Sequence, residues 1–185
     1  MTGWRVFSAD GHDVSWQTWD GAHTEHLTLR WENEAWTASG EVGCERVQYV
    51  LRLAPTWRLR QFLLFRDLDE PDLWLATDGH NRWGEVNGAH RPELDGCVDL
   101  ELACSPFPLS LPILRLPLDT GDAAELPVVT VDVETLAVDH ATRRYERVGD
   151  RRWRVIDVAS GDATAFDVDD HGIVIDQPGR FRRLP

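Results

Sequence analysis

The stretch DGCVDLELACSPFPLSLPILRL, residues 95–116, joins a strand pattern to the one segment of the chain that suggests a helix. In its first half, hydrophobic residues alternate with Asp99 and Glu101, which is typical of a β-strand. In its second half, prolines stand among leucines. A short helix is expected to begin with Ser110 as its N-cap and to end before Pro117.

Strand patterns also run through the sequence on both sides of this stretch. EHLTLRW, VQYVLRL and TWRLRQFLLF precede it, and PVVTVDV, RRYERV, RWRVIDV, ATAFDV and GIVID follow it. DLWLATDGHNRWGEV has the pattern of a hairpin with its turn at Asp78-Gly79. We therefore expect a mainly antiparallel β protein with at most one substantial helix.

The size and composition favour one domain covering residues 1–185. Hydrophobic residues make up 42% of the chain and charged residues 28%, as in an ordinary globular protein. Each half contains an arginine-rich strand around a tryptophan, followed by a turn with Asp, His and Gly. Two similar halves with a boundary near residues 105–117 are one interpretation, and chance similarity among short strands is the other.

The charge of the chain limits its partners. A net charge of −13 repels nucleic-acid phosphates and anionic membrane surfaces, so we expect no nucleic acid and no stable membrane insertion. All 19 basic residues are arginine. Chemistry that requires lysine, such as a Schiff base, is therefore excluded.

Cysteine usage and the amino terminus indicate the compartment. Cys44, Cys97 and Cys104 form no C-x-x-C pair and are expected to be reduced and buried. The sequence has no signal-peptide pattern and no apolar run long enough to span a membrane. We expect a cytoplasmic protein.

The acidic row permits two interpretations. Period 2 puts Asp99 and Glu101 on one face of a strand, where they either meet water or line a cavity together with Asp95. As a glycosidase pair their backbones would lie roughly 6.6 Å apart, but both project from the same side. Catalysis would need a partner from another strand, such as Asp78 or His80.

Other catalytic patterns are missing from the sequence. It has no G-x-S-x-G elbow and no phosphate loop, and His23 and His26 would point to opposite faces of an extended segment. We therefore expect no cofactor and no metal. A binding protein is favoured over a carboxylate-dependent hydrolase or isomerase.

The sequence also resembles a known family. LDGCVDLELACSPFPLSLPILRL, with VVTVDV, RRYERV and DDHGIVIDQPGRFRRL, resembles a bacterial glycolipid-binding family that was formerly a domain of unknown function. Glu101 stands where that family usually has Asp, Pro108-Leu109 replace a Thr-Asn pair, Leu114 replaces an arginine, and Gln177 replaces a tyrosine.

The resemblance implies a large, strongly curved antiparallel sheet, open and barrel-like, wrapped around a single helix, distantly similar to lipoprotein-localisation carriers. It also implies a homodimer and an acidic pocket that binds a glycolipid or a related sugar-bearing molecule without catalysis. Carried over by motif, the ligand-binding residues are Asp95, Asp99 and Glu101, with Arg115 pairing with the acids. The proline-rich segment would supply a rigid pocket wall or a dimer edge.

Overall fold

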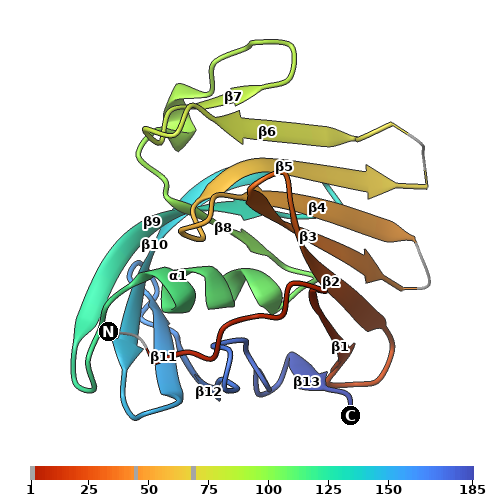
Figure 1. Ribbon diagram of the computed structural model, residues 1–185. Coiled ribbons are helices and arrows are strands. Elements are labelled where there is room, and N and C mark those ends of the chain that lie inside the picture. Colours follow the sequence, from red (N-terminus) through yellow and green to blue (C-terminus); the bar gives the residue numbers. More distant parts are fainter. Residues whose placement is uncertain (1–2, 44–45, 68–69) are drawn as a thin grey trace.

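The computed structural model describes residues 3–43, 46–67 and 70–185. Two curved sheets enclose α1, Ser110–Arg115, which is the one α-helix within these residues (Figure 1). The prediction of a mainly β protein with a large curved sheet around a single helix is confirmed.

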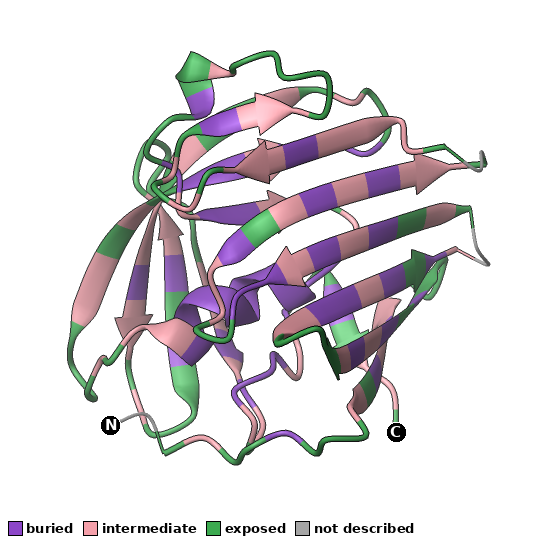
Figure 2. Cartoon of the chain, turned by 45° about the horizontal axis from the view of Figure 1, so that its top comes forward, coloured by how far each residue is buried: buried purple, intermediate pink, exposed green. Residues whose placement is uncertain are grey.

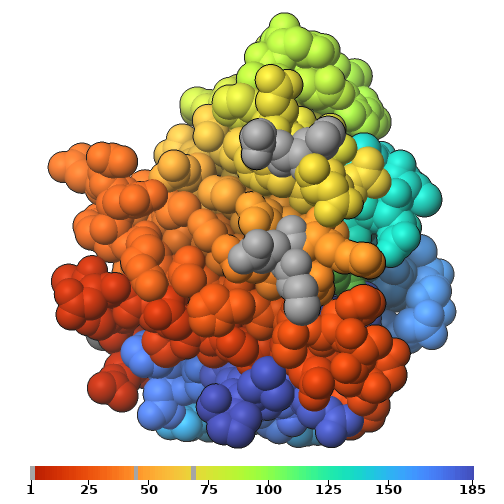
Figure 3. Space-filling model, turned by 90° about the vertical axis from the view of Figure 1, so that its right-hand side faces the viewer, coloured from red at the N-terminus to blue at the C-terminus, as the bar shows by residue number. Residues whose placement is uncertain are grey.

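The larger sheet is antiparallel throughout, in the order β13-β1-β2-β3-β4-β5-β6-β7. Figure 3 shows this order from the blue carboxyl-terminal segment at the bottom, through red and orange, to yellow-green at the top. Its strands are β1 (His12–Thr18), β2 (Thr24–Glu32), β3 (Ala35–Val42), β4 (Val47–Leu53), β5 (Leu59–Arg66), β6 (Leu73–Thr77), β7 (Trp83–Glu85) and β13 (Phe181–Arg183).

Alternation in these strands sorts hydrophobic side chains to the inner face. Tyr49, Leu51 and Leu53 of β4 are fully buried, and Figure 2 shows the same alternation along neighbouring strands. The expected hairpin is formed by β6 and β7, with positive φ at Gly79 and at Asn81.

The predicted strand at GIVID is wrong. Residues 172–176 contribute only an isolated bridge between Val168 and Val174. The backbone amide of Ile173 donates instead to the Asp169 carboxylate, and that of Val174 donates to Ser110 Oγ. Because these amides are used by side chains, no ladder with a neighbouring strand forms here.

The smaller sheet has the order β12-β11-β10-β9-β8, and β8 runs parallel to β9. Parallel neighbours need a crossover connection that covers one face of the sheet. That connection contains α1 and the 3₁₀ turn η2, whereas the 3₁₀ turn η1 precedes β8. The elements are η1 (Pro92–Leu94), β8 (Asp99–Leu102), η2 (Phe107–Leu109), β9 (Ala123–Val131), β10 (Val138–Arg147), β11 (Arg152–Asp157) and β12 (Ala163–Asp167).

The helix has a different beginning from the one predicted. Helical backbone starts at Phe107 in η2, so Ser110 is the first residue of α1 and its side chain caps no helix amide. Leu111 and Ile113 are fully buried. Figure 2 shows most of the helix in the colour of buried residues. The hydrophobic segment therefore belongs to the interior of the chain, and its expected use as a dimer edge is wrong.

Both faces of β8 are covered. Leu100 and Leu102 belong to the larger hydrophobic core, which includes residues of both sheets. Asp99 lies on the opposite face, beside α1, with only 1% of its side chain exposed. Parallel strands are typically buried on both faces, and at Asp99 the interpretation of a water-facing acid is wrong.

Candidate functional site

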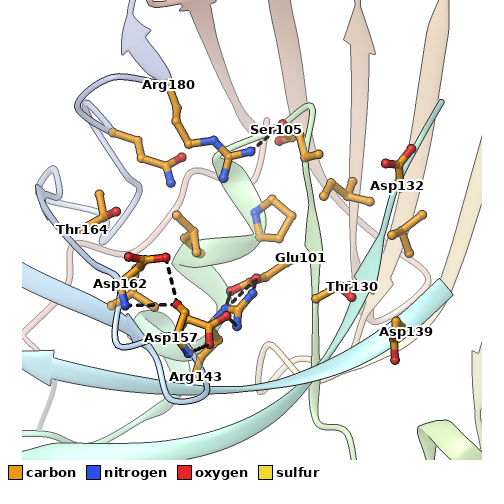
Figure 4. Close-up of a pocket in the computed structure, with 18 of the residues that line it drawn as sticks. Glu101, Ser105, Thr130, Asp132, Asp139, Arg143, Asp157, Asp162, Thr164 and Arg180 are labelled. Carbon is orange, nitrogen blue, oxygen red and sulfur yellow. Dashed lines mark hydrogen bonds and ion pairs between the residues drawn. The ribbon is translucent and has the colours of Figure 1, made fainter. Parts of the chain in front are cut away.

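A cavity of about 490 Å³ lies beside η2, on the face of the smaller sheet that carries Glu101 and Thr130 (Figure 4). Its volume falls in the usual range for small-molecule sites. Leu102, Pro108, Leu109, Val131 and Val155 form hydrophobic parts of its wall. Its charged lining residues are Glu101, Asp132, Asp139, Asp157, Asp162, Arg143 and Arg180.

Arg143 organises one side of the cavity. The Nε atom of Arg143 donates to both carboxylate oxygens of Glu101, at 3.1 and 3.0 Å, and its Nη1 atom lies 2.5 Å from Asp157 Oδ2. Arg143 and Asp157 are direct cross-strand partners in β10 and β11. One guanidinium from the sheet thus holds two carboxylates at the cavity wall.

The two carboxylates held by Arg143 differ in pKa. Burial raises the pKa of Glu101 above its ordinary value, although Arg143 opposes this effect. The pKa of Asp157 is lowered, first by the backbone amide of Ser160 and also by Arg143. Asp157 therefore provides an ionised acceptor at neutral pH.

Arg180 reaches the cavity from the opposite side to Arg143 (Figure 4). Its Nη2 atom donates to the carbonyl oxygen of Ala103 at 3.1 Å. Across the described ranges, it forms no ion pair with a carboxylate, so several of its N–H donors are left for a ligand.

A buried network supports Ser105 at the cavity rim. Ser105 Oγ donates to Glu25 Oε1 at 2.6 Å and lies 2.9 Å from the hydroxyl of Tyr49. The Tyr49 ring lies over Gly40, where an added Cβ would come within 2.2 Å of it. Burial raises the pKa of Glu25 to about 7.

The structure separates the four predicted ligand-binding residues. Glu101 lines the cavity. Asp99 forms a buried ion pair with Arg115 of α1, as the resemblance implied, and neither is among the lining residues. Asp95 lies before β8, where it accepts hydrogen bonds from the backbone amide of Trp83 and from the His90 ring. Ligand binding by Asp95, Asp99 and Arg115 stays a prediction.

Asp99 is fully enclosed. Burial raises its pKa to about 6, against the opposite effect of Arg115. In the part of the chain that the structure describes, Asp99 Oδ1 and Arg115 Nε have no hydrogen-bond partner. The ion pair thus leaves one carboxylate oxygen and one guanidinium N–H group without a partner among the described residues.

Sequence reasoning missed most of the residues that line the cavity. Arg143, Asp157 and Asp162 come from β10, β11 and the turn after β11, and Arg180 comes from the approach to β13. The polar residues on the inner face of β10 were a usable signal, because Asp139 and Arg143 are spaced to share one face. The suggested catalytic partner Asp78 binds backbone amides in the β6–β7 turn, and neither it nor His80 lines the cavity.

The cysteines among the described residues form no disulfide. Cys97 and Cys104 are free, and burial raises their pKa values to about 11 and about 12. Cys44 lies outside the described residues. No helix in the described ranges is long and apolar enough to cross a membrane.

Comparison with known proteins gives the family. A family model described as "Putative glycolipid-binding" matches residues 13–183, and the chain belongs to this family. The fold is similar to the crystal structure of a DUF1089 family protein from Pseudomonas aeruginosa, with a TM-score of 0.71 and 25% identity. That match covers 98% of this chain and 95% of the other. No curated protein matches.

Proposed function

We propose that the chain binds a sugar-bearing lipid without catalysis, with the sugar headgroup in the cavity beside η2. The observation that carries this proposal is the lining: carboxylates and hydroxyls beside a hydrophobic wall, in a volume of about 490 Å³. Carboxylates accept hydrogen bonds from sugar hydroxyls, and a hydrophobic wall suits a ring face or the start of an acyl chain. The family description is consistent with this ligand class.

The charge of the lining favours an uncharged headgroup. Five carboxylates and two guanidiniums line the cavity, and Arg143 is already paired with two of the carboxylates. A phosphate-bearing headgroup would meet repulsion from the others. A headgroup rich in hydroxyls would instead find acceptors on Asp157 and Asp162.

A carboxylate-dependent hydrolase is the second candidate. The pKa of Glu101 is raised and that of Asp157 is lowered within one cavity, and such a difference is typical of an acid–base pair. However, the single guanidinium of Arg143 holds both carboxylates, so they lie on one side of a ligand and do not flank a bond. We therefore favour binding over hydrolysis.

We also propose that the protein works as a homodimer in the cytoplasm. The resemblance to the family supports the dimer, and the free thiols of Cys97 and Cys104 support a reducing compartment. Light scattering at micromolar concentrations should give twice the mass of the chain, and the mass of one chain at all concentrations would contradict the dimer.

Native mass spectrometry of the protein purified from its own host tests binding directly, because a retained lipid adds its mass to the protein. A calorimetric titration with octyl β-D-glucoside, below its critical micelle concentration, measures the affinity. Asp157→Asn should weaken binding about 10-fold, whereas Asp119→Asn, at an exposed loop position, should bind as the parent does. No retained lipid and no binding of any glycoside would overturn the proposal, and hydrolysis of the glycoside would favour the second candidate.

A further inference from the structure

The segment Gln177-Pro178-Gly179-Arg180 forms a tight turn above the cavity. The backbone amide of Arg180 donates to the carbonyl oxygen of Gln177 at 2.9 Å, and Gly179 has a φ of 77°. Proline at the second position and a positive φ at the third are the marks of a type II turn. This geometry holds the first and last residues close together, and both line the cavity.

The side chain of Gln177 lines the cavity and has no hydrogen-bond partner among the residues that the structure describes. The residue is 5% exposed and lines the cavity. Its backbone groups bond to Arg180 and Phe181, whereas its side-chain amide makes no hydrogen bond within the described residues. Although the residue is mostly enclosed, its amide atoms are not among the fully buried polar atoms without a partner, so they open onto the cavity. The amide is therefore available to a ligand in the cavity.

Arg180 adds donors at the same place. Its guanidinium is anchored by the Ala103 carbonyl oxygen and forms no carboxylate ion pair among the described residues. The turn therefore presents the N–H groups of Arg180 beside the side-chain amide of Gln177. The NH2 group of this amide donates hydrogen bonds, and its carbonyl oxygen accepts them. Across the cavity, Glu101 and Asp157 present acceptors instead.

We propose that Gln177 and Arg180 form a specificity-determining subsite for an uncharged carbonyl group on the sugar, such as an acetamido group. An amide pairs with another amide by one N–H and one carbonyl oxygen, and Arg180 adds a donor to that oxygen. An anionic group is disfavoured because five carboxylates line the same cavity. This inference rests on the proposed function of sugar binding.

Calorimetric titration with methyl N-acetyl-β-D-glucosaminide, methyl β-D-glucoside and inorganic phosphate tests the subsite. The parent protein should bind the N-acetylated sugar about 10-fold more tightly than the glucoside, and phosphate weakly or not at all. Gln177→Met keeps the length of the side chain and removes its hydrogen bonds, so it should abolish this preference. Gln48→Met makes the same change at an exposed position of β4 and should keep it.

Gln177→Glu provides a second variant, because it keeps the shape but replaces the amide donor by a charge. Urea unfolding should show that both Gln177 variants are folded before their affinities are compared. Equal affinity of the parent for the two sugars, or an unchanged preference in both folded variants, would overturn the subsite while leaving sugar binding in place. Failure of the parent to bind either sugar would instead overturn the proposed function.

Discussion

Asp99 and Glu101 stand two residues apart on the same face of β8, and each has an arginine partner. Asp99 pairs with Arg115 from the helix, and 1% of its side chain is exposed. Glu101 pairs with Arg143 from β10, keeps 18% exposure and lines the cavity. Their chemistry is alike, and their surroundings differ.

The difference shows that the covering element, rather than the residue type or its periodicity, decides what a carboxylate on this strand can do. Arg115 at the end of α1 pairs with the enclosed Asp99, whereas Glu101 lines the cavity beside η2. We therefore expect changes at Asp99 to lower stability and changes at Glu101 to lower affinity.

The largest effect is expected from Asp99→Ala. It leaves the guanidinium of Arg115 without its partner in a buried site, which typically costs about 3–5 kcal/mol of unfolding free energy. Urea denaturation measures this loss. Asp119→Ala, at an exposed loop position, should leave the unfolding midpoint unchanged. A similar small effect from both variants would remove the distinction between Asp99 and the surface acids.

Glu25 differs from both Asp99 and Glu101, because it is a buried carboxylate with no arginine partner among the described residues. Its folded-state pKa of about 7 exceeds the ordinary 4.5, so its favourable contribution is complete below pH 4.5 and is lost as pH rises through 7. Glu25→Gln should remove on the order of 3 kcal/mol of this pH-dependent loss. Urea unfolding at pH 5 and pH 8 measures how much unfolding free energy the parent and the variant each lose between the two pH values. An equal loss in both proteins would contradict the prediction.

Glu101→Gln should act mainly on binding. Losing one charged acceptor that contacts a sugar hydroxyl should weaken glycoside binding by about 1–3 kcal/mol, with a smaller change in stability. The matched control is Glu41→Gln on the exposed side of β3. Calorimetry with octyl β-D-glucoside measures the affinities. A large loss of stability with unchanged affinity would reverse the roles assigned to Glu101 and Asp99.

The smallest effect is expected from Asp95→Asn. Its ion pair with His90 is exposed, and asparagine can still accept the hydrogen bond from the backbone amide of Trp83. We expect an unfolding midpoint and a glycoside affinity within error of the parent. A clear loss of affinity would bring Asp95 into the site, as the family resemblance implied.

Sequence alone predicted the β class, most strands and the position of the helix, because period-2 alternation and proline placement are local signals. It failed for GIVID, where side chains accept the hydrogen bonds of the Ile173 and Val174 backbone amides. The sequence also did not decide whether Asp99 faces water or the interior of the protein. The parallel pairing of β8 with β9, which buries both faces, depends on contacts distant in sequence.

The candidate site was predicted only at Glu101. Arg143 and Asp157 meet through the register of β10 and β11, and Arg180 joins them from a turn near the end of the chain. A local sequence pattern does not predict which residues of distant segments lie together in one cavity. The departure at Gln177 was visible in the sequence, but its position in the cavity wall required the fold.

The most direct test of the account is a crystal structure of the protein with octyl β-D-glucoside bound. We predict that the sugar ring lies in the cavity, with its hydroxyls donating to Asp157 and Glu101 and with Arg180 on the opposite side. A sugar bound elsewhere on the chain, or an empty cavity at concentrations that saturate binding in solution, would contradict it.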